Sequence, residues 1–170
     1  MDNASLLNSY WVLPGRFLAG EYPGTAGESE TRLRLRWLLS RGVSWILDLT
    51  EAGEYGLLPY AGLLPGEAAY QRLPIRDFGT PSREEMHRIQ GALRSALAAG
   101  QTVYVHCYGG VGRTGTVVGC YLREQGYAGQ EALAEIARLR RGLPNGWRPS
   151  PETDAQRQMI VAWELIDDRD

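Results

Sequence analysis

The sequence predicts an α/β fold in which a mainly parallel central sheet of four or five strands is flanked by helices on both faces. Short apolar runs alternate along the chain with longer segments whose apolar residues recur at helical spacing. No repeat, low-complexity run or linker interrupts this alternation, and 170 residues suffice for one domain with a substantial core. A glycine-rich loop joins one strand-like run to a helical run. We therefore expect a single domain over residues 1–170, with its ligand site beyond the carboxyl ends of the parallel strands.

The first part of the chain predicts a hairpin, a helix and a central strand. Pro14 and Gly15 separate two β-type runs and favour a chain reversal between them. Leu33 and Trp37 recur at helical spacing in a segment that ends before a glycine. The expected elements are a hairpin over residues 10–19, a helix over 28–41 and a strand over 43–50.

The middle of the chain is less regular. Residues 53–67 have no clean period and predict a loop or a short irregular helix, and residues 69–74 predict a short strand. Ser82 and Glu85 have the spacing of a capping box, which indicates a helix that runs to about residue 99.

The last part of the chain predicts a buried strand followed by three helices. The strand covers residues 102–106, and the first two helices cover 112–125 and 130–141. Ser150 as N-cap and Pro151 at the first helical position predict the start of a final helix that reaches about residue 167.

Residues 103–116, with the sequence Val-Tyr-Val-His-Cys-Tyr-Gly-Gly-Val-Gly-Arg-Thr-Gly-Thr, carry the chemistry. Their glycines let the backbone curl so that successive N–H groups point into one concavity, which suits an anion. The helix that follows presents its positive end to the same place. Cys107, beside this helix end and Arg113, is favoured as a thiolate nucleophile. The planar guanidinium of Arg113 can hold two phosphoryl oxygens at once.

The order His106-Cys107, five residues, Arg113-Thr114 resembles the signature of the cysteine-dependent protein tyrosine phosphatase superfamily. The compact length resembles the dual-specificity branch, so the resemblance implies a single phosphatase domain of that fold. It implies that Cys107 attacks phosphorus, that Arg113 and the loop amides hold the oxygens, and that Thr114 helps the thiolate leave. His106 would orient the loop from beneath. The substrate-binding loop would comprise Tyr108, Gly109, Gly110, Val111 and Gly112.

Residues 74–81, Pro-Ile-Arg-Asp-Phe-Gly-Thr-Pro, resemble the mobile acid loop of the same superfamily, without the tryptophan common in its larger members. The resemblance implies that Asp77 protonates the leaving oxygen and that Gly79 serves as a hinge. By itself Asp77 would be interpreted as a turn residue; the downstream Cys107 loop favours the catalytic role.

Gln156 is a candidate supporting residue. Many tyrosine phosphatases position the hydrolytic water with a glutamine from a Gln-Thr-x-x-Gln pattern, and residues 152–156 retain only the second glutamine. Gln158 could serve instead, and a solvated helix face is the alternative for both residues.

Three other interpretations of the loop fail on residue type or spacing. Residues 110–115 spell G-x-G-x-x-G, but the acidic residue that a dinucleotide site requires, Glu131, falls inside a predicted helix. A Walker A loop would need Gly in place of Cys107 and Lys in place of Arg113. A rhodanese-like site would leave the Arg-Thr pair and Asp77 unexplained. The purely structural interpretation, in which Cys107 is only a buried core residue, would leave Arg113 and the glycines unexplained.

Composition excludes several classes of function. The formal net charge is −2 and 22% of residues are charged, which predicts no nucleic-acid partner. The sequence has two cysteines, Cys107 and Cys120, and two histidines, which provide neither a disulfide framework nor a metal cluster. We therefore expect no cofactor, and we expect the protein to occur in a reducing compartment. The N-terminus lacks a basic flank, and no run of 18 apolar residues occurs, so we expect a cytoplasmic protein without a membrane span.

The resulting hypothesis is a metal-independent phosphomonoester hydrolase that acts through a phosphocysteine intermediate, as a protein tyrosine or dual-specificity phosphatase. Its expected partner is a phosphorylated protein or peptide. The alternatives are a phosphoinositide or inositol phosphate phosphatase and a non-hydrolysing phospho-binding module. Residues 108–112 contain no Lys or Arg, which argues against highly charged inositol polyphosphates. Binding alone would need neither the thiolate of Cys107 nor the acid Asp77.

Overall fold

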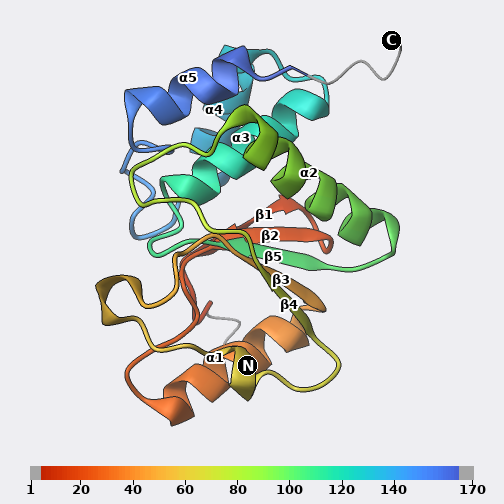
Figure 1. The fold of residues 1–170 in the computed structure, drawn as a ribbon, viewed down its shortest axis with the longest axis vertical. Helices are drawn as coiled ribbons and strands as arrows, with labels where there is room; N and C mark the ends of the chain where they lie inside the picture. Colours follow the sequence, from red (N-terminus) through yellow and green to blue (C-terminus); the bar gives the residue numbers. More distant parts are fainter. Residues whose placement is uncertain (1–4, 165–170) are drawn as a thin grey trace.

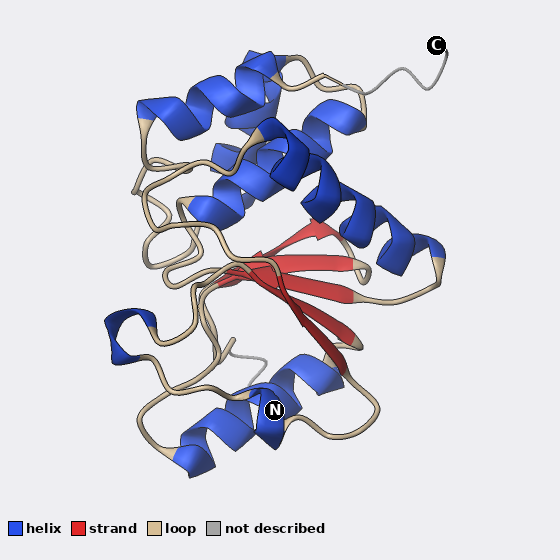
Figure 2. Ribbon diagram, viewed as in Figure 1, coloured by secondary structure: helices blue, strands red, loops and turns tan. Residues whose placement is uncertain are grey.

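The computed structural model describes residues 5–164 and has three layers, with helices on either side of a sheet (Figures 1 and 2). The sheet has five strands in the order β1-β2-β5-β3-β4. Strand β1 is antiparallel to β2, and all other neighbours are parallel. The strands are β1 (Ser9–Leu13), β2 (Phe17–Gly20), β3 (Trp45–Asp48), β4 (Ala69–Arg72) and β5 (Val103–His106). The predicted α/β fold with a mainly parallel sheet and a hairpin at one edge is confirmed.

The helices divide between the two faces of the sheet (Figure 1). Helix α1 (Glu28–Ser40) covers one face, and α2 (Arg83–Ala98), α3 (Arg113–Glu124), α4 (Gly129–Leu139) and α5 (Asp154–Ala162) lie on the other. Two short 3₁₀ turns, η1 (Glu54–Gly56) and η2 (Ala61–Leu63), occupy the segment that was expected to be irregular. Between residues 5 and 164 no helix is both long and apolar enough to cross a bilayer.

Each face of the sheet has its own hydrophobic core, and β5 contributes to both. Val103 and Val105 pack into the core under α2 to α5, while Tyr104 packs into the core over α1. All four residues of β5 are buried because the strand is central and covered on both faces. The carboxyl end of β5 therefore delivers Cys107 from a rigid element.

The start of the last helix differs from the prediction. Thr153, not Ser150, is the N-cap, and its hydroxyl accepts from the amide of Gln156 at 3.1 Å while the side chain of Gln156 accepts from the amide of Thr153 at 3.1 Å. Ser150 instead donates its hydroxyl to the carbonyl of Val111 at 2.6 Å. The reciprocal capping box at residues 153–156 thus defines the helix, because the Ser150 hydroxyl has a tertiary partner. The expected end near residue 167 lies outside the described residues.

Candidate active site

The loop between β5 and α3 places Cys107 at the bottom of a cavity. Cys107 is 3% exposed, and its Sγ accepts from the amide of Gly110 at 3.3 Å. Gly110 has φ +73°, and a Cβ there would lie 2.5 Å from the carbonyl carbon of Gly20. Only glycine can adopt this conformation so close to a neighbouring backbone. The curl of the loop around the sulfur therefore depends on that residue.

Helix α3 begins directly after this loop. Its N-cap, Gly112, supplies no side-chain acceptor for the first amides of the helix. These amides are among the donors that a helix leaves unsatisfied at its N-terminus, where the dipole is positive. Together with the amides of the curled loop and the thiol of Cys107, they form a setting suited to a phosphoryl group.

Arg113, the first residue of α3, is buried and held by acidic groups. Its Nη1 and Nη2 atoms donate to the two carboxylate oxygens of Glu54 at 2.9 Å and 2.6 Å, and Nη1 also donates to the carbonyl of Ile75 at 2.9 Å. Nη2 lies 3.3 Å from Oδ1 of Asp77. Burial opposes the charge of Arg113, but the hydrogen bonds that it donates to Glu54 and the nearby negative groups raise its pKa above the ordinary value for arginine. The guanidinium is therefore a fixed cation, and its Nε has no partner among the described residues.

Asp77 is fixed between a tyrosine and this arginine. Its Oδ2 accepts from the hydroxyl of Tyr55 at 2.5 Å, and its Oδ1 accepts from the amide of Phe78 at 3.0 Å. Tyr55 and Phe78 have φ +51° and +60°, and they are the only residues other than glycine with positive φ in the described part of the chain. Such backbone is costly for these side chains and is typical of functional segments. Two strained loops thus meet at Asp77.

A buried polar cluster supports the loop from the side of α1. The Nδ1 atom of His106 lies 3.0 Å from the carbonyl of Cys107, and the hydroxyl of Tyr60 contacts its Nε2. Burial lowers the pKa of His106 and raises that of Tyr60, so at neutral pH the imidazole is uncharged and the phenol keeps its proton. Nδ1–H therefore donates to Cys107 O, and Nε2 accepts from Tyr60. This arrangement fixes the ring beneath the nucleophile.

Asp48, at the end of β3, anchors the same cluster. Its Oδ1 accepts from the amide and hydroxyl of Thr50 at 2.9 Å and 2.6 Å, and its Oδ2 accepts from Tyr70 at 2.6 Å and Arg72 at 3.1 Å. Burial opposes ionisation, but the facing His106 and the hydrogen bonds from Thr50 and Tyr70 hold the pKa of Asp48 below its ordinary 3.8. Asp48 is therefore an ionised carboxylate with four donors.

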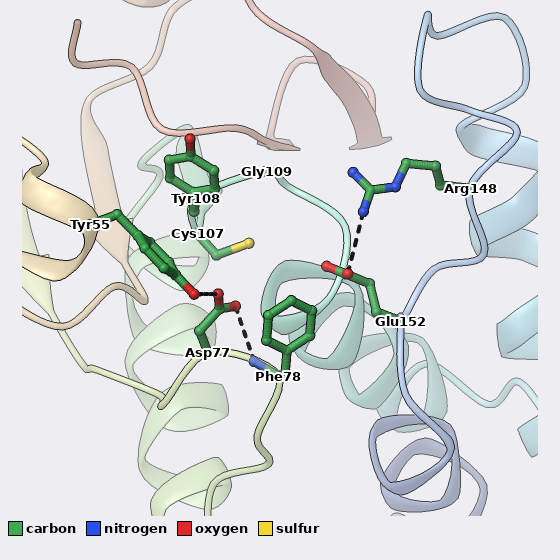
Figure 3. A pocket seen from close by; sticks show the side chains of 8 residues that line it. All are labelled: Tyr55, Asp77, Phe78, Cys107, Tyr108, Gly109, Arg148 and Glu152. Atoms are coloured by element: carbon green, nitrogen blue, oxygen red, sulfur yellow. Dashed lines mark hydrogen bonds and ion pairs between the residues drawn. The ribbon is translucent and has the colours of Figure 1, made fainter. Parts of the chain in front are cut away.

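The cavity above Cys107 has a volume of about 370 Å³ and two dissimilar sides (Figure 3). Aromatic side chains form one side, and the rings of Tyr55 and Tyr108 lie 5.5 Å apart there. An arginine and a glutamate from the segment before α5 form the other. The lining residues are Tyr55, Asp77, Phe78, Cys107, Tyr108, Gly109, Arg148 and Glu152.

The structure brings most of the predicted site residues together. Cys107, Asp77, Tyr108 and Gly109 line the cavity. Thr114 is fully buried just after Arg113, and its Oγ1 has no partner among the described residues. Gly110, Val111 and Gly112 complete the loop, and His106 lies below it.

Gln156 does not line the cavity. It is fully buried, its Oε1 accepts from the amides of Glu152 and Thr153, and its Nε2 donates to the carbonyl of Gly79 at 3.2 Å. The side chain therefore links the start of α5 to the acid loop. Gln158, the alternative, is exposed.

Sequence reasoning gave Arg148 and Glu152 no role in the site, named Tyr55 only as a candidate wall of a cleft, and named Glu54 only as a substitute acid. Glu54 and Tyr55 lie in the segment without a clean period, Arg148 lies in the predicted loop before the last helix, and Glu152 falls within that predicted helix. A charged or aromatic residue in an irregular segment carries no positional signal, because only tertiary packing brings it to the cavity.

Comparison with known proteins identifies the family. Residues 22–127, more than half of the chain, match the family described as "Tc-R-P: Polymorphic toxin system, DSP-PTPase phosphatase". The chain belongs to this family, which confirms the predicted protein tyrosine phosphatase superfamily and its dual-specificity branch.

A relative and one solved structure agree with this assignment, and a second solved structure shares the fold. "Putative tyrosine phosphatase 067L" of Invertebrate iridescent virus 3 is 39% identical over 90 residues, which are 50% of this chain and 36% of that protein. The chain thus spans about a third of the length of the curated relatives it matches. Tk-PTP in its active form is 27% identical with a TM-score of 0.71, covering 90% of this chain and 93% of the other. Kinase associated phosphatase, with its catalytic cysteine replaced by serine, is 19% identical with a TM-score of 0.71, covering 96% and 100%, and shows the shared fold.

Proposed function

We propose that this protein hydrolyses phosphomonoesters through a phosphocysteine intermediate. The observation that carries the proposal is that Cys107 and Asp77 line one cavity, while the buried Arg113 at the N-terminus of α3 lies 3.3 Å from Asp77. A nucleophile, an anion-binding loop, a fixed cation and an acid are the components that phosphoryl transfer to a thiolate needs.

In the first step the sulfur of Cys107 attacks phosphorus and the bond from phosphorus to the leaving oxygen breaks. The loop amides and Arg113 hold the equatorial oxygens, with the unpartnered Nε of Arg113 as one available donor. Glu54 keeps the guanidinium in place during this exchange because it binds both terminal nitrogens. Asp77 transfers its proton to the leaving oxygen, which departs as an alcohol or phenol.

In the second step a water molecule attacks the phosphocysteine. Asp77, now ionised, accepts the proton of that water, the sulfur–phosphorus bond breaks, and phosphate and the thiolate are released. The free Oγ1 of buried Thr114 can donate to the departing sulfur. Gln156 supports this step indirectly, because its bond to Gly79 O connects α5 to the loop that carries Asp77.

The preferred substrate class is an aryl phosphate, and phosphotyrosine on a protein is the form we propose. Tyr55, Phe78 and Tyr108 line the cavity and are 66%, 58% and 52% exposed. Exposed aromatic side chains at a cavity mouth favour contact with another ring. We also propose a cytoplasmic location, which the two free thiols, Cys107 and Cys120, support.

Turnover of p-nitrophenyl phosphate tests the proposal. The wild type should hydrolyse it, while Cys107→Ser should be folded and inactive, since a serine hydroxyl is not ionised at neutral pH. Circular dichroism checks the fold, and calorimetry with inorganic phosphate checks that the variant still binds the anion. Cys120→Ser is the matched control, because Cys120 is fully buried on α3 and burial raises its pKa, so it remains a thiol. Wild-type turnover that survives in Cys107→Ser would refute the mechanism.

A further inference from the structure

The charged side of the cavity bears on which phosphotyrosine peptides the protein prefers. Resting on the proposed function, we propose that Arg148 is a specificity-determining residue that binds an acidic side chain next to the phosphotyrosine of a peptide substrate. Arg148 lines the same cavity as Cys107 and lies across it from Tyr55 and Tyr108 (Figure 3).

The segment that carries Arg148 is anchored by another arginine. Arg140 is 1% exposed, and its Nη1 and Nη2 donate to the carbonyls of Arg148 and Asn145 at 2.7 Å and 3.0 Å. No ion pair between Arg140 and a carboxylate occurs in the part of the chain that the structure describes. A buried cation whose donors go to the carbonyls of one segment fixes that backbone. Ser150 joins the same segment to the catalytic loop through its bond to Val111 O.

The side chain of Arg148 retains binding capacity. Its Nη2 lies 3.5 Å from Oε2 of Glu152, and its other side-chain nitrogens have no partner among residues 5–164. Within this pair the arginine side chain is 46% exposed and the glutamate 23%. The cation is thus the more accessible member, so an acidic group of the substrate meets Arg148 first.

The remaining charges of the cavity favour a peptide with one acidic neighbour over a polyphosphorylated ligand. Asp77 and Glu152 line the cavity with Arg148, and Arg113 is already paired with Glu54. The two carboxylates repel a ligand that carries several phosphates. A peptide with one acidic side chain next to its phosphotyrosine instead complements the cavity, because Arg148 can bind the carboxylate and the aromatic side chains can contact the ring.

The test compares phosphotyrosine peptides of one base sequence. Each carries a single Glu at one of the two positions before or the two after the phosphotyrosine, and the reference peptide carries Gln at all four. The wild type should prefer the best Glu peptide by about fivefold in kcat/KM, as expected for a partly exposed ion pair. The preference should shrink with added salt, because exposed charges are screened.

Variants of the protein distinguish a specific effect of Arg148 from an effect of the overall net charge. In Arg148→Gln the ratio between the Glu and Gln peptides should fall to about one, and Arg148→Glu should instead favour a peptide with Arg at that position. Arg36→Gln is the matched control: Arg36 is exposed on α1, on the other face of the sheet, and its loss changes the net charge equally. This control should keep the wild-type ratio.

Failure of the proposed role of Arg148 can be distinguished from failure of the proposed hydrolase function. No turnover of p-nitrophenyl phosphate would refute the hydrolase itself. Turnover with equal kcat/KM for all peptides, or a preference that persists in Arg148→Gln, would refute the role of Arg148 alone. Faster hydrolysis of short-chain phosphoinositides than of any peptide, lost in Arg148→Gln, would assign the residue to a lipid headgroup and also overturn the proposal.

Discussion

The charged residues of the site satisfy one another before any substrate is present. Arg113 contacts Glu54 and Asp77, and Asp77 also accepts from Tyr55. A phosphoryl group that enters the cavity therefore meets a guanidinium that is already held in place, with Nε as a donor that has no partner among the described residues. Such a prearranged set of dipoles and charges is how enzymes stabilise charge without reorganisation.

Replacement of Asp77 tests the acid. Asp77→Ala should lower kcat by about 10² to 10⁴ with KM nearly unchanged, because the proton is transferred only in the transition state. Phenyl phosphate should lose more than a substrate whose leaving group is a stable anion. Steady-state kinetics with the two substrates measures both effects.

Glu152→Gln is the comparison for that experiment. Glu152 is the other carboxylate that lines the cavity, whereas Asp48 lies in the buried cluster and Glu54 binds Arg113. If Asp77→Ala kept near wild-type kcat while Glu152→Gln removed the leaving-group dependence, the acid would be Glu152.

Asp48 allows a prediction about stability and pH. Asp48→Asn should destabilise the fold by about 1 to 3 kcal/mol at pH 7, because an amide cannot accept from four donors. The pKa of Asp48 is lower in the folded protein, so its contribution is present above the unfolded value near pH 4 and is lost as pH falls through the folded value. Urea unfolding at pH 7 and at about pH 3 should therefore show the difference from wild type shrinking in acid.

A matched control for Asp48→Asn is Asp154→Asn. Asp154 is 93% exposed at the start of α5, so its substitution should change the free energy of unfolding by about 0.5 kcal/mol or less. A difference for Asp48→Asn that stays constant between the two pH values would contradict the role of its ionised form.

Among the elements, the junction between α5 and the acid loop has the clearest mechanical role. Gln156 caps α5 and holds Gly79, two residues after Asp77. The segment before α5 also supplies Arg148 and Glu152 to the cavity. One helix start thus positions parts of both sides of the site.

Gln156 and Gln158 can be compared directly. Gln156→Ala should lower stability by about 1 to 2 kcal/mol, since it leaves the carbonyl of Gly79 and the amides of Glu152 and Thr153 without partners. It should also lower kcat, because the acid loop loses its anchor. Gln158→Ala should change neither quantity, because Gln158 is exposed. Thermal unfolding and p-nitrophenyl phosphate kinetics of both variants provide the test, and a larger loss of kcat in Gln158→Ala would show that Gln158 has the catalytic role.

In the whole molecule, the sheet brings distant segments of the chain to one edge. Strands β3 and β5 are parallel neighbours, so the segments after Asp48 and after His106 emerge side by side and Glu54 reaches Arg113. The positive field at this edge comes from the protein itself, through α3 and Arg113. Activity should therefore be the same, within about twofold, in EDTA and in Mg²⁺ or Zn²⁺ at low concentration. Loss of turnover in EDTA with recovery on adding a divalent ion would contradict this mechanism.

The predictable parts of the molecule are those that depend on local rules. The strand-loop-helix around Cys107 was identified from its glycines, and the start of α2 from its capping box, because both depend on residues close in sequence. The acid loop was identified through its resemblance to a family motif.

The remaining parts depend on packing between distant segments. Ser150 and Pro151 have the local pattern of a helix start, yet Ser150 binds Val111 and the helix begins after Thr153. Likewise, no local pattern shows that Glu54 pairs with a residue 59 positions away, or that Arg140 turns inward to hold the carbonyl of Arg148. These contacts decide the shape of the cavity.

The glycines of the catalytic segment have a further consequence for how the molecule can be divided. The backbone of Gly20 fills the space beside Gly110, and Ile160 of α5 fills the space beside Gly119. Both of these neighbours lie outside residues 22–127, the stretch that the family shares. That stretch therefore cannot be transferred by itself. Without the flanking segments, Gly110 would lose its contact with the backbone of Gly20, and Gly119 would lose its contact with Ile160. A transfer of this catalytic unit into another protein has to include the first hairpin and the last helix.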